Sequence, residues 1–87
     1  MAYKGRIGTK ETERHYPHIV ELRVPPNGFG TRLNDMHRWH FNQGIQSQRG
    51  RGRYHDGRHY IRWCFADPKE AKAFQAEFGG ELIKPST

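Results

Sequence analysis

The sequence predicts a small α+β domain with the element order β-α-β-β-α-β, a four-stranded antiparallel sheet and two helices on one face. A chain of 87 residues can build one small core and no second one. An Asp-Gly dipeptide at residues 56–57 stands between segments rich in β-forming residues, which is a strong hairpin signal. Residues 67–70 read Asp-Pro-Lys-Glu, a capping box with proline at the first helical position.

We expect residues 1–16 to form a flexible basic arm and residues 17–87 to form a single α+β domain. The first segment mixes Lys, Gly, Thr, Glu and Arg with no hydrophobic period. The first strand is expected at residues 18–24, HIVELRV, where apolar and charged residues alternate. One face of this strand should therefore be buried, while the other carries Glu21 and Arg23.

A helix is expected after the Pro-Pro-Asn-Gly turn, between the candidate cap Thr31 and the candidate stop Gly44. At helical spacing, apolar and histidine side chains share one face, which we expect to be buried. These residues are Leu33, Met36, His37, His40 and Phe41.

The Asp-Gly turn predicts a hairpin with a defined register, in which His55 lies opposite Arg58 and Gln48 lies opposite Phe65. This register sorts the side chains by the two-residue period of strands. The core face receives the bulky apolar residues and two glycines that leave room for them: Gly50, Gly52, Ile61, Trp63 and Phe65. The opposite face receives five arginines beside His55, Tyr60 and Cys64: Arg49, Arg51, Arg53, Arg58 and Arg62.

The second helix is expected to begin at Pro68 and to end at the glycine pair of residues 79–80. Its buried stripe should consist of Ala71, Phe74 and Phe78. Residues 81–84 could add a short last strand.

The chain resembles the RNA-recognition-motif domain, a family with the ferredoxin-like fold, in its element order and in part of its third strand. That family's third strand alternates basic, small and aromatic residues. The segment RHYIRWCF at residues 58–65 matches it at Arg58, Tyr60 and Phe65, and the helix that starts in ADPKEAKAF follows as in the family.

Two departures from the family pattern limit what the resemblance implies. Arg62 replaces the second stacking aromatic of the third strand, and Glu21 stands where the first strand usually has an aromatic. The resemblance therefore implies a ferredoxin-like fold and the stacking of a single base on Tyr60.

The charge of the chain favours a negatively charged partner. The net charge is +6 and the isoelectric point is near 9.9. Ten of the fifteen basic residues are arginines, which pair with phosphates through two N–H groups and stack on bases. We therefore expect the open sheet face to bind nucleic acid, RNA more readily than DNA, with an affinity that falls steeply with salt. The expected contact residues are Arg23, Arg49, Arg51, Arg53, His55, Arg58, Tyr60 and Arg62.

Two other functions remain open. The basic face could dock on an acidic protein surface, as a phage or bacterial inhibitor or adaptor would, and the edge strand could form a homodimer. A metal-independent ribonuclease could use His55 or His59 with Arg58 and Tyr60. We expect no enzymatic activity, because the chain has no carboxylate pair and no Cys/His/Asp order typical of a hydrolase.

No cofactor is expected. His37 and His40 are candidates for a metal site by helical spacing alone, but a structural role at the core edge is favoured. The chain has one cysteine and hence no internal disulfide. It has no apolar run of transmembrane length, and its first residues lack the apolar core of a secretory signal. We therefore expect a cytoplasmic protein with no membrane partner.

Overall fold

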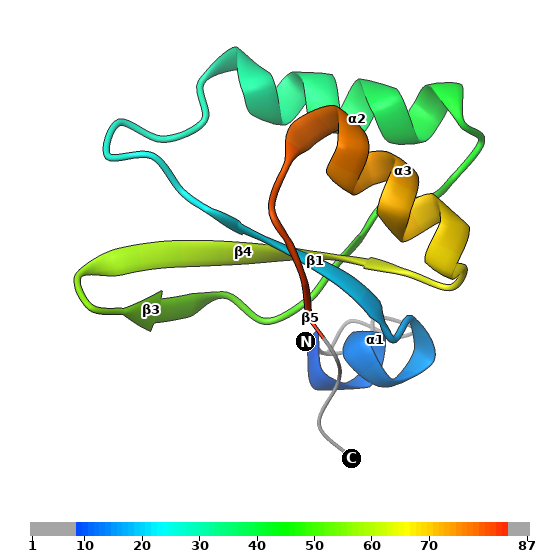
Figure 1. Cartoon of the computed structure of the whole chain (residues 1–87), viewed down its shortest axis with the longest axis horizontal. Helices are drawn as coiled ribbons and strands as arrows, with labels where there is room; N and C mark the ends of the chain where they lie inside the picture. The colour runs from blue at the N-terminus through cyan, green and yellow to red at the C-terminus, as the bar shows by residue number, and fades with distance from the viewer. Residues whose placement is uncertain (1–8, 84–87) are drawn as a thin grey trace, which may run out of the picture.

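An antiparallel sheet with helices on both sides forms the framework of the protein (Figure 1). The structure is a computed structural model that describes residues 9–83. The predicted α+β class and antiparallel sheet are confirmed, but these residues form five strands and three helices where the sequence predicts four and two. In chain order the elements are α1 (Thr9–His15), β1 (His18–Arg23), α2 (Thr31–Asn42), β2 (Gln48–Arg49), β3 (Arg53–His55), β4 (Arg58–Phe65), α3 (Pro68–Phe78) and β5 (Glu81–Ile83).

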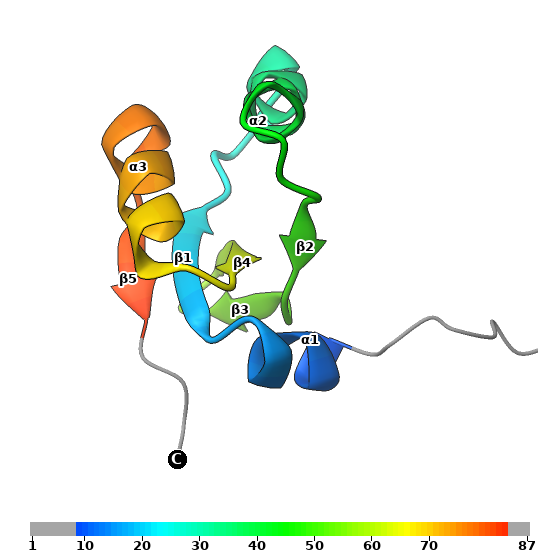
Figure 2. The ribbon, with the colours of Figure 1, turned by 90° about the vertical axis from the view of Figure 1, so that its right-hand side faces the viewer.

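The sheet has the order β2-β4-β1-β5, and β3 also pairs with β4. Helices α2 and α3 cover one face of the sheet, and α1 lies on the opposite side (Figure 2). Helix α1 occupies the second half of the segment expected to be a flexible arm, whereas residues 1–8 lie outside the described residues. Within residues 9–83, none of the helices combines the length and the apolar character that crossing a membrane requires.

The hairpin between β3 and β4 has the predicted register at its turn. His55 lies opposite Arg58, and Arg53 lies opposite Tyr60. The two turn residues at 56–57 both adopt positive φ, 54° for the aspartate and 73° for the glycine. Positive φ at both central residues is the geometry whose twist matches that of the flanking strands.

Beyond β3 the predicted register is wrong by one residue. Gln48 pairs with Cys64 instead of Phe65, and Arg49 pairs with Trp63. The three residues 50–52 therefore face only two residues of β4, which is a β-bulge. The bulge separates β2 from β3 and explains the fifth strand. It also exchanges the faces of the residues before it, so Arg49 joins the core face and Gly50 joins the opposite face.

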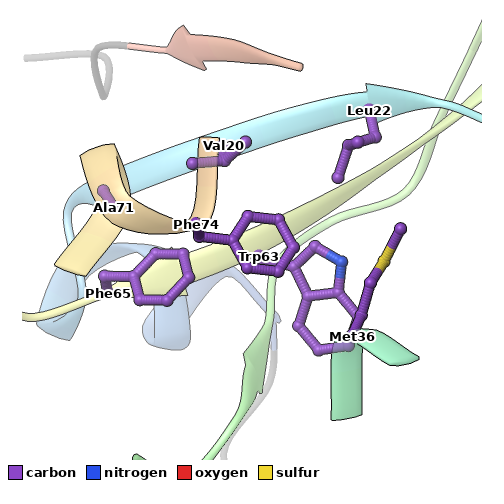
Figure 3. Close-up of a cluster of buried hydrophobic side chains, with 7 residues drawn as sticks. All are labelled: Val20, Leu22, Met36, Trp63, Phe65, Ala71 and Phe74. Atoms are coloured by element: carbon purple, nitrogen blue, oxygen red, sulfur yellow. The ribbon is translucent and has the colours of Figure 1, made fainter. Parts of the chain in front are cut away.

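The core lies between the sheet and the pair of helices α2 and α3 (Figure 3). Aromatic rings dominate it, with Trp63 and Phe65 projecting from β4 and Phe74 from α3. Val20 and Leu22 of β1 pack against these rings, as predicted. Ile19 and Glu21 on the opposite face of β1 are also buried, at 1% and 5% exposure, so the expectation that only one face of this strand is buried is wrong. Large rings bury much area per residue, which suits a chain with only 33% hydrophobic residues.

The buried face predicted for α2 is partly wrong. Met36 and His40 are buried, but His37 is exposed and Phe41 is 83% exposed. Trp39 instead packs toward α3, with its ring centroid 5.3 Å from that of Phe74. Because α3 flanks only that side, the contact stripe of α2 is rotated toward Trp39 and away from Phe41.

Helix α3 begins and ends where the sequence predicts. The Asp67 side chain accepts a hydrogen bond of 2.9 Å from the backbone N–H two residues later. Gly79 follows the last helical residue with a φ of 84°, a conformation that favours glycine. These two ends hold Phe74 over the sheet, where its ring centroid lies 6.0 Å from that of Trp63.

Candidate nucleic-acid interface

We call the face of the sheet opposite α2 and α3 the second sheet face. Its members follow from strand alternation and from the observed pairing. They are Ile19, Glu21 and Arg23 of β1, Arg53 and His55 of β3, Arg58, Tyr60, Arg62 and Cys64 of β4, and Glu81 and Ile83 of β5.

A buried carboxylate at the centre of this face binds two of its arginines. Glu21 is 5% exposed. Arg53 donates to both of its oxygens, from Nε to Oε2 at 3.1 Å and from Nη2 to Oε1 at 2.9 Å. Arg62 donates from Nε to Oε2 at 3.1 Å. The hydrogen bond from Arg53, joined by that from Arg62, lowers the pKa of Glu21 despite the opposing effect of burial. Glu21 is therefore a buried, negatively charged residue that holds the side chains of Arg53 and Arg62 in place.

Helix α1 adds a second carboxylate to the network. Nη1 of Arg62 donates to Oε1 of Glu13 at 3.1 Å and to Oε2 at 3.2 Å. The backbone N–H of Arg51 also donates to Glu13 Oε2, at 2.7 Å. Burial acts to lower the pKa of Arg62, but hydrogen bonds to Glu21 and Glu13 outweigh it and the pKa is raised. The positive charge of Arg62 is thus offset by two carboxylates, those of Glu21 and Glu13.

The remaining arginines of the second sheet face surround Tyr60, in a group of residues that we call the Tyr60 cluster. The guanidinium of Arg53 lies over the Tyr60 ring, 4.4 Å from its centroid. Arg23 is opposite Tyr60 on β1, and Arg58 precedes it by two residues on the same face. Both of these arginines are exposed, and within residues 9–83 neither makes an ion pair. The Tyr60 cluster consists of Arg23, Arg53, Arg58 and Tyr60.

Of the other predicted contact residues, His55 lies opposite Arg58 at the border of this cluster, whereas Arg49 and Arg51 lie apart from it. Arg49 lies on the core face with its guanidinium 4.9 Å from the centroid of the Trp63 ring, and burial lowers its pKa. Its predicted position on the exposed face is wrong because of the bulge. Arg51 is exposed within the bulge, and His55 is exposed beside Asp56, with Nε2 3.7 Å from Oδ2.

The two histidines of α2 lie in different surroundings. Within residues 9–83, no three His, Cys, Asp or Glu side chains are grouped to hold a metal ion. His40 donates from Nδ1 to the carbonyl oxygen of Met36 at 2.8 Å, and its ring stacks on Phe65 with centroids 5.4 Å apart. His37 is exposed and meets the edge of Trp63 instead. Burial lowers the pKa of His40, so its imidazole is neutral in the core.

Acidification is expected to destabilise the fold through His40. The folded-state pKa of His40 lies below its unfolded value of 6.5, so only the unfolded chain takes up the proton readily below that pH. The stability is therefore present above pH 6.5 and is lost as the pH falls, by at most about 1.4 kcal/mol per pH unit. Urea denaturation between pH 7.5 and pH 5 should show this loss in the wild type and less of it in His40→Phe. Parallel curves for the two proteins would contradict the assignment.

The possible ribonuclease residues lie on both faces of the hairpin. His55 lies on the second sheet face, whereas the adjacent strand positions place His59 on the core side of the hairpin. The His59 ring packs against Tyr54, with centroids 4.6 Å apart. Of the two alternatives, His55 lies on the same face as Arg58 and Tyr60, whereas His59 does not.

Sequence reasoning missed Glu13 and the anchoring role of Glu21. A signal for α1 was present, because Glu11 lies in its first turn and Arg14 and His15 lie in its last turn, an arrangement that complements the helix dipole. The pairing of Glu21 with Arg62 follows from the register of β1 and β4, which no local pattern specifies.

Comparison with known proteins does not identify a relative that would indicate the function. No known protein family, no curated protein and no solved structure matches this chain. The function must therefore be inferred from the geometry and charge of the second sheet face.

Proposed function

We propose that the protein binds single-stranded nucleic acid, RNA more readily than DNA, on the Tyr60 cluster. The observation that carries this proposal is the position of the Arg53 guanidinium. It donates two hydrogen bonds to Glu21 and lies over the Tyr60 ring. A guanidinium plane and an aromatic ring are both platforms for an unpaired base. Arg23 and Arg58, which have no carboxylate partner within residues 9–83, flank this platform where phosphates would pass.

The order of the strands supports the same proposal. β1 pairs with β4 along one edge, so β2 and β3 must both use the other edge of β4. We infer that β2 and β3 are two halves of one strand interrupted by the bulge. When β2 and β3 count together as the second strand, β4 is the third strand and the sheet has the ferredoxin-like order. Tyr60 then occupies the position at which the RNA-recognition-motif family, which the chain resembles, stacks a base.

The salt dependence of binding should be modest. Two of the arginines on the second sheet face are offset by carboxylates, which leaves two unpaired charges in the Tyr60 cluster. For single strands, log K falls with log salt by about 0.7 per neutralised phosphate, so these two charges contribute a slope of about −1.4. Five freely available arginines would give about −3.5 by the same rule.

Fluorescence anisotropy with a labelled single-stranded RNA of about ten nucleotides tests the proposal. Arg58→Gln should weaken binding several-fold and reduce the salt slope by about 0.7, because it removes one phosphate contact. Arg38→Gln is the matched control: it removes one exposed arginine from α2, on the other side of the sheet. A DNA strand of the same sequence should bind more weakly.

Two outcomes would contradict this proposal. The absence of RNA binding at low salt would exclude the function itself. Equal losses of affinity in Arg58→Gln and Arg38→Gln would mean that binding follows the overall charge of the protein, and the Tyr60 cluster would not be the site.

A second candidate function is self-association through β5, which is favoured by a groove beside it. Among the described residues β5 pairs only with β1, so its outer edge is free to accept another strand. Next to it lies an open pocket of about 370 Å³, and Leu82 at its border is 44% exposed. Sedimentation equilibrium would show a dimer under this candidate, and the RNA titration would show no binding. The pocket is lined by Pro17, His18, Ile19, Pro68, Ala71, Lys72, Leu82 and Ile83.

A further inference from the structure

Helix α1 covers part of the second sheet face although it is too short to be stable by itself. It has seven residues, and isolated helices below about 12 residues are marginal in water. On the views in Figure 1 and Figure 2 it lies alone on its side of the sheet among the described helices. Its formation therefore depends on its contacts with the sheet.

Glu13 provides the polar contacts that attach α1 to this face. Its carboxylate accepts from Nη1 of Arg62 and from the backbone N–H of Arg51, over distances of 2.7 to 3.2 Å. The side chain of Glu13 is 16% exposed, and that of Arg62 is 20% exposed. A guanidinium and a backbone N–H that converge on one anion are also the donors that phosphate groups use.

The contact between α1 and the bulge is tight. A methyl group added at Gly50 would lie 2.6 Å from Oε2 of Glu13 and 2.9 Å from Sγ of Cys64. Cys64 is 1% exposed. Its burial, together with the negative charge of Glu13, raises the pKa of the thiol to about 12. The thiol is therefore shielded and unreactive while α1 is in place.

We propose that α1 is a displaceable cover and that a phosphate of the bound nucleic acid replaces the Glu13 carboxylate on Arg62 and on the Arg51 N–H. Displacement frees Nη1 of Arg62 and the Arg51 N–H, while Nε of Arg62 stays bound to Glu21, and it lengthens the strand-binding surface along β4. The nature of the ligand rests on the proposed function, whereas the opening of α1 does not. Local opening of a seven-residue helix outside the core needs no unfolding of the core.

The reactivity of Cys64, the single cysteine of the chain, measures the opening without any ligand. Glu13→Gln should speed its reaction with an aromatic disulfide reagent about tenfold, because a hydrogen bond to a charged group is lost. Glu13→Asp should also speed the reaction, since the shorter side chain weakens the contacts with Arg62 and the Arg51 N–H while the charge is unchanged. Glu11→Gln should react like the wild type, because within residues 9–83 Glu11 pairs only with Arg14 and His15 of its own helix.

Far-UV circular dichroism and urea unfolding of each variant separate local opening from global loss of structure. If α1 opens locally, the thiol of these variants should react faster than that of the wild type at urea concentrations where the global fold is intact. Equal reaction rates in Glu13→Gln, Glu13→Asp and the wild type would overturn the proposal.

RNA affinity tests the displacement itself. Glu13→Gln and Glu11→Gln each remove one negative charge from α1, but only Glu13 competes for Arg62. Glu13→Gln should therefore bind single-stranded RNA about tenfold more tightly than Glu11→Gln. If RNA binds but the two variants gain equally, overall charge explains the gain and the displacement is wrong. If no variant binds RNA, the proposed function and the displacement both fail, while the thiol rates still decide whether α1 opens.

Discussion

Replacing Trp63 with alanine is expected to lower the free energy of unfolding by about 4 kcal/mol, because the change removes a large ring from a closely packed site. Trp63 is fully buried at 0% exposure. Its ring contacts those of His40 and Phe74, with centroids 4.9 and 6.0 Å away, and it carries the guanidinium of Arg49 on its face. A small domain has a total stability of about 5–15 kcal/mol, so much of the variant should be unfolded at mild urea concentrations.

Urea denaturation followed by circular dichroism measures this effect. Phe41→Ala is the matched control, because Phe41 is also aromatic but is 83% exposed on α2. Its replacement should change the stability by less than about 0.5 kcal/mol. A similar cost for the two variants would show that the core is not centred on β4 as described.

Glu21→Gln is expected to destabilise the protein by about 2 to 3 kcal/mol at neutral pH. Removing one partner of a buried ion pair leaves the opposite charges uncompensated. The cost is at the low end for buried pairs because the side chains of Arg53 and Arg62 are 40% and 20% exposed and can turn to water. Glu77→Gln, an exposed glutamate on α3, is the control and should have little effect.

The effect of Glu21 should depend on pH in a defined direction. The pKa of Glu21 in the folded protein is lowered from 4.5, chiefly by its hydrogen bond to Arg53. Its contribution to stability is therefore present above pH 4.5 and is lost as the pH falls through the folded-state pKa. The stability curves of the wild type and Glu21→Gln should converge in acid. A constant difference at all pH values would mean that the charge of Glu21 is not what stabilises the fold.

Two parts of the structure could be predicted because they depend on neighbouring residues alone. The turn at residues 56–57 needs only two residues that tolerate positive φ between β-forming segments. The start of α3 needs only the side chain of Asp67 and the proline that follows it. The core face of β1 belongs to the same class, since Val20 and Leu22 share one face of the strand.

The bulge could not be predicted, because arginine and glycine alternate through residues 49–53 and fit two registers equally well. Glycine has no side chain that is driven to one face, so such a segment specifies its register weakly. The apolar residues of β4 keep their faces in both registers. The bulge changes the site in two ways. It removes Arg49 from the second sheet face, and it places Gly50 against Glu13.

The position of α1 could not be predicted for a different reason. Its segment has no hydrophobic period, and its attachment depends on an ion pair between Glu13 and Arg62, which are 49 residues apart in the sequence. The same ion pair offsets the charge on which the sequence-based expectation of an arginine surface depends. The structure thus leaves a smaller basic site than composition indicates, centred on Tyr60.

Backbone amide shifts during a titration of the labelled protein with single-stranded RNA test the central claim most directly. The Tyr60 cluster predicts that the largest shifts occur at Arg23 and along residues 58–62, with smaller shifts in α1 as it is displaced. Shifts confined to α2 and α3, or to the groove beside β5, would place the ligand elsewhere and contradict the account. Unchanged spectra at low salt and saturating RNA would contradict nucleic-acid binding altogether.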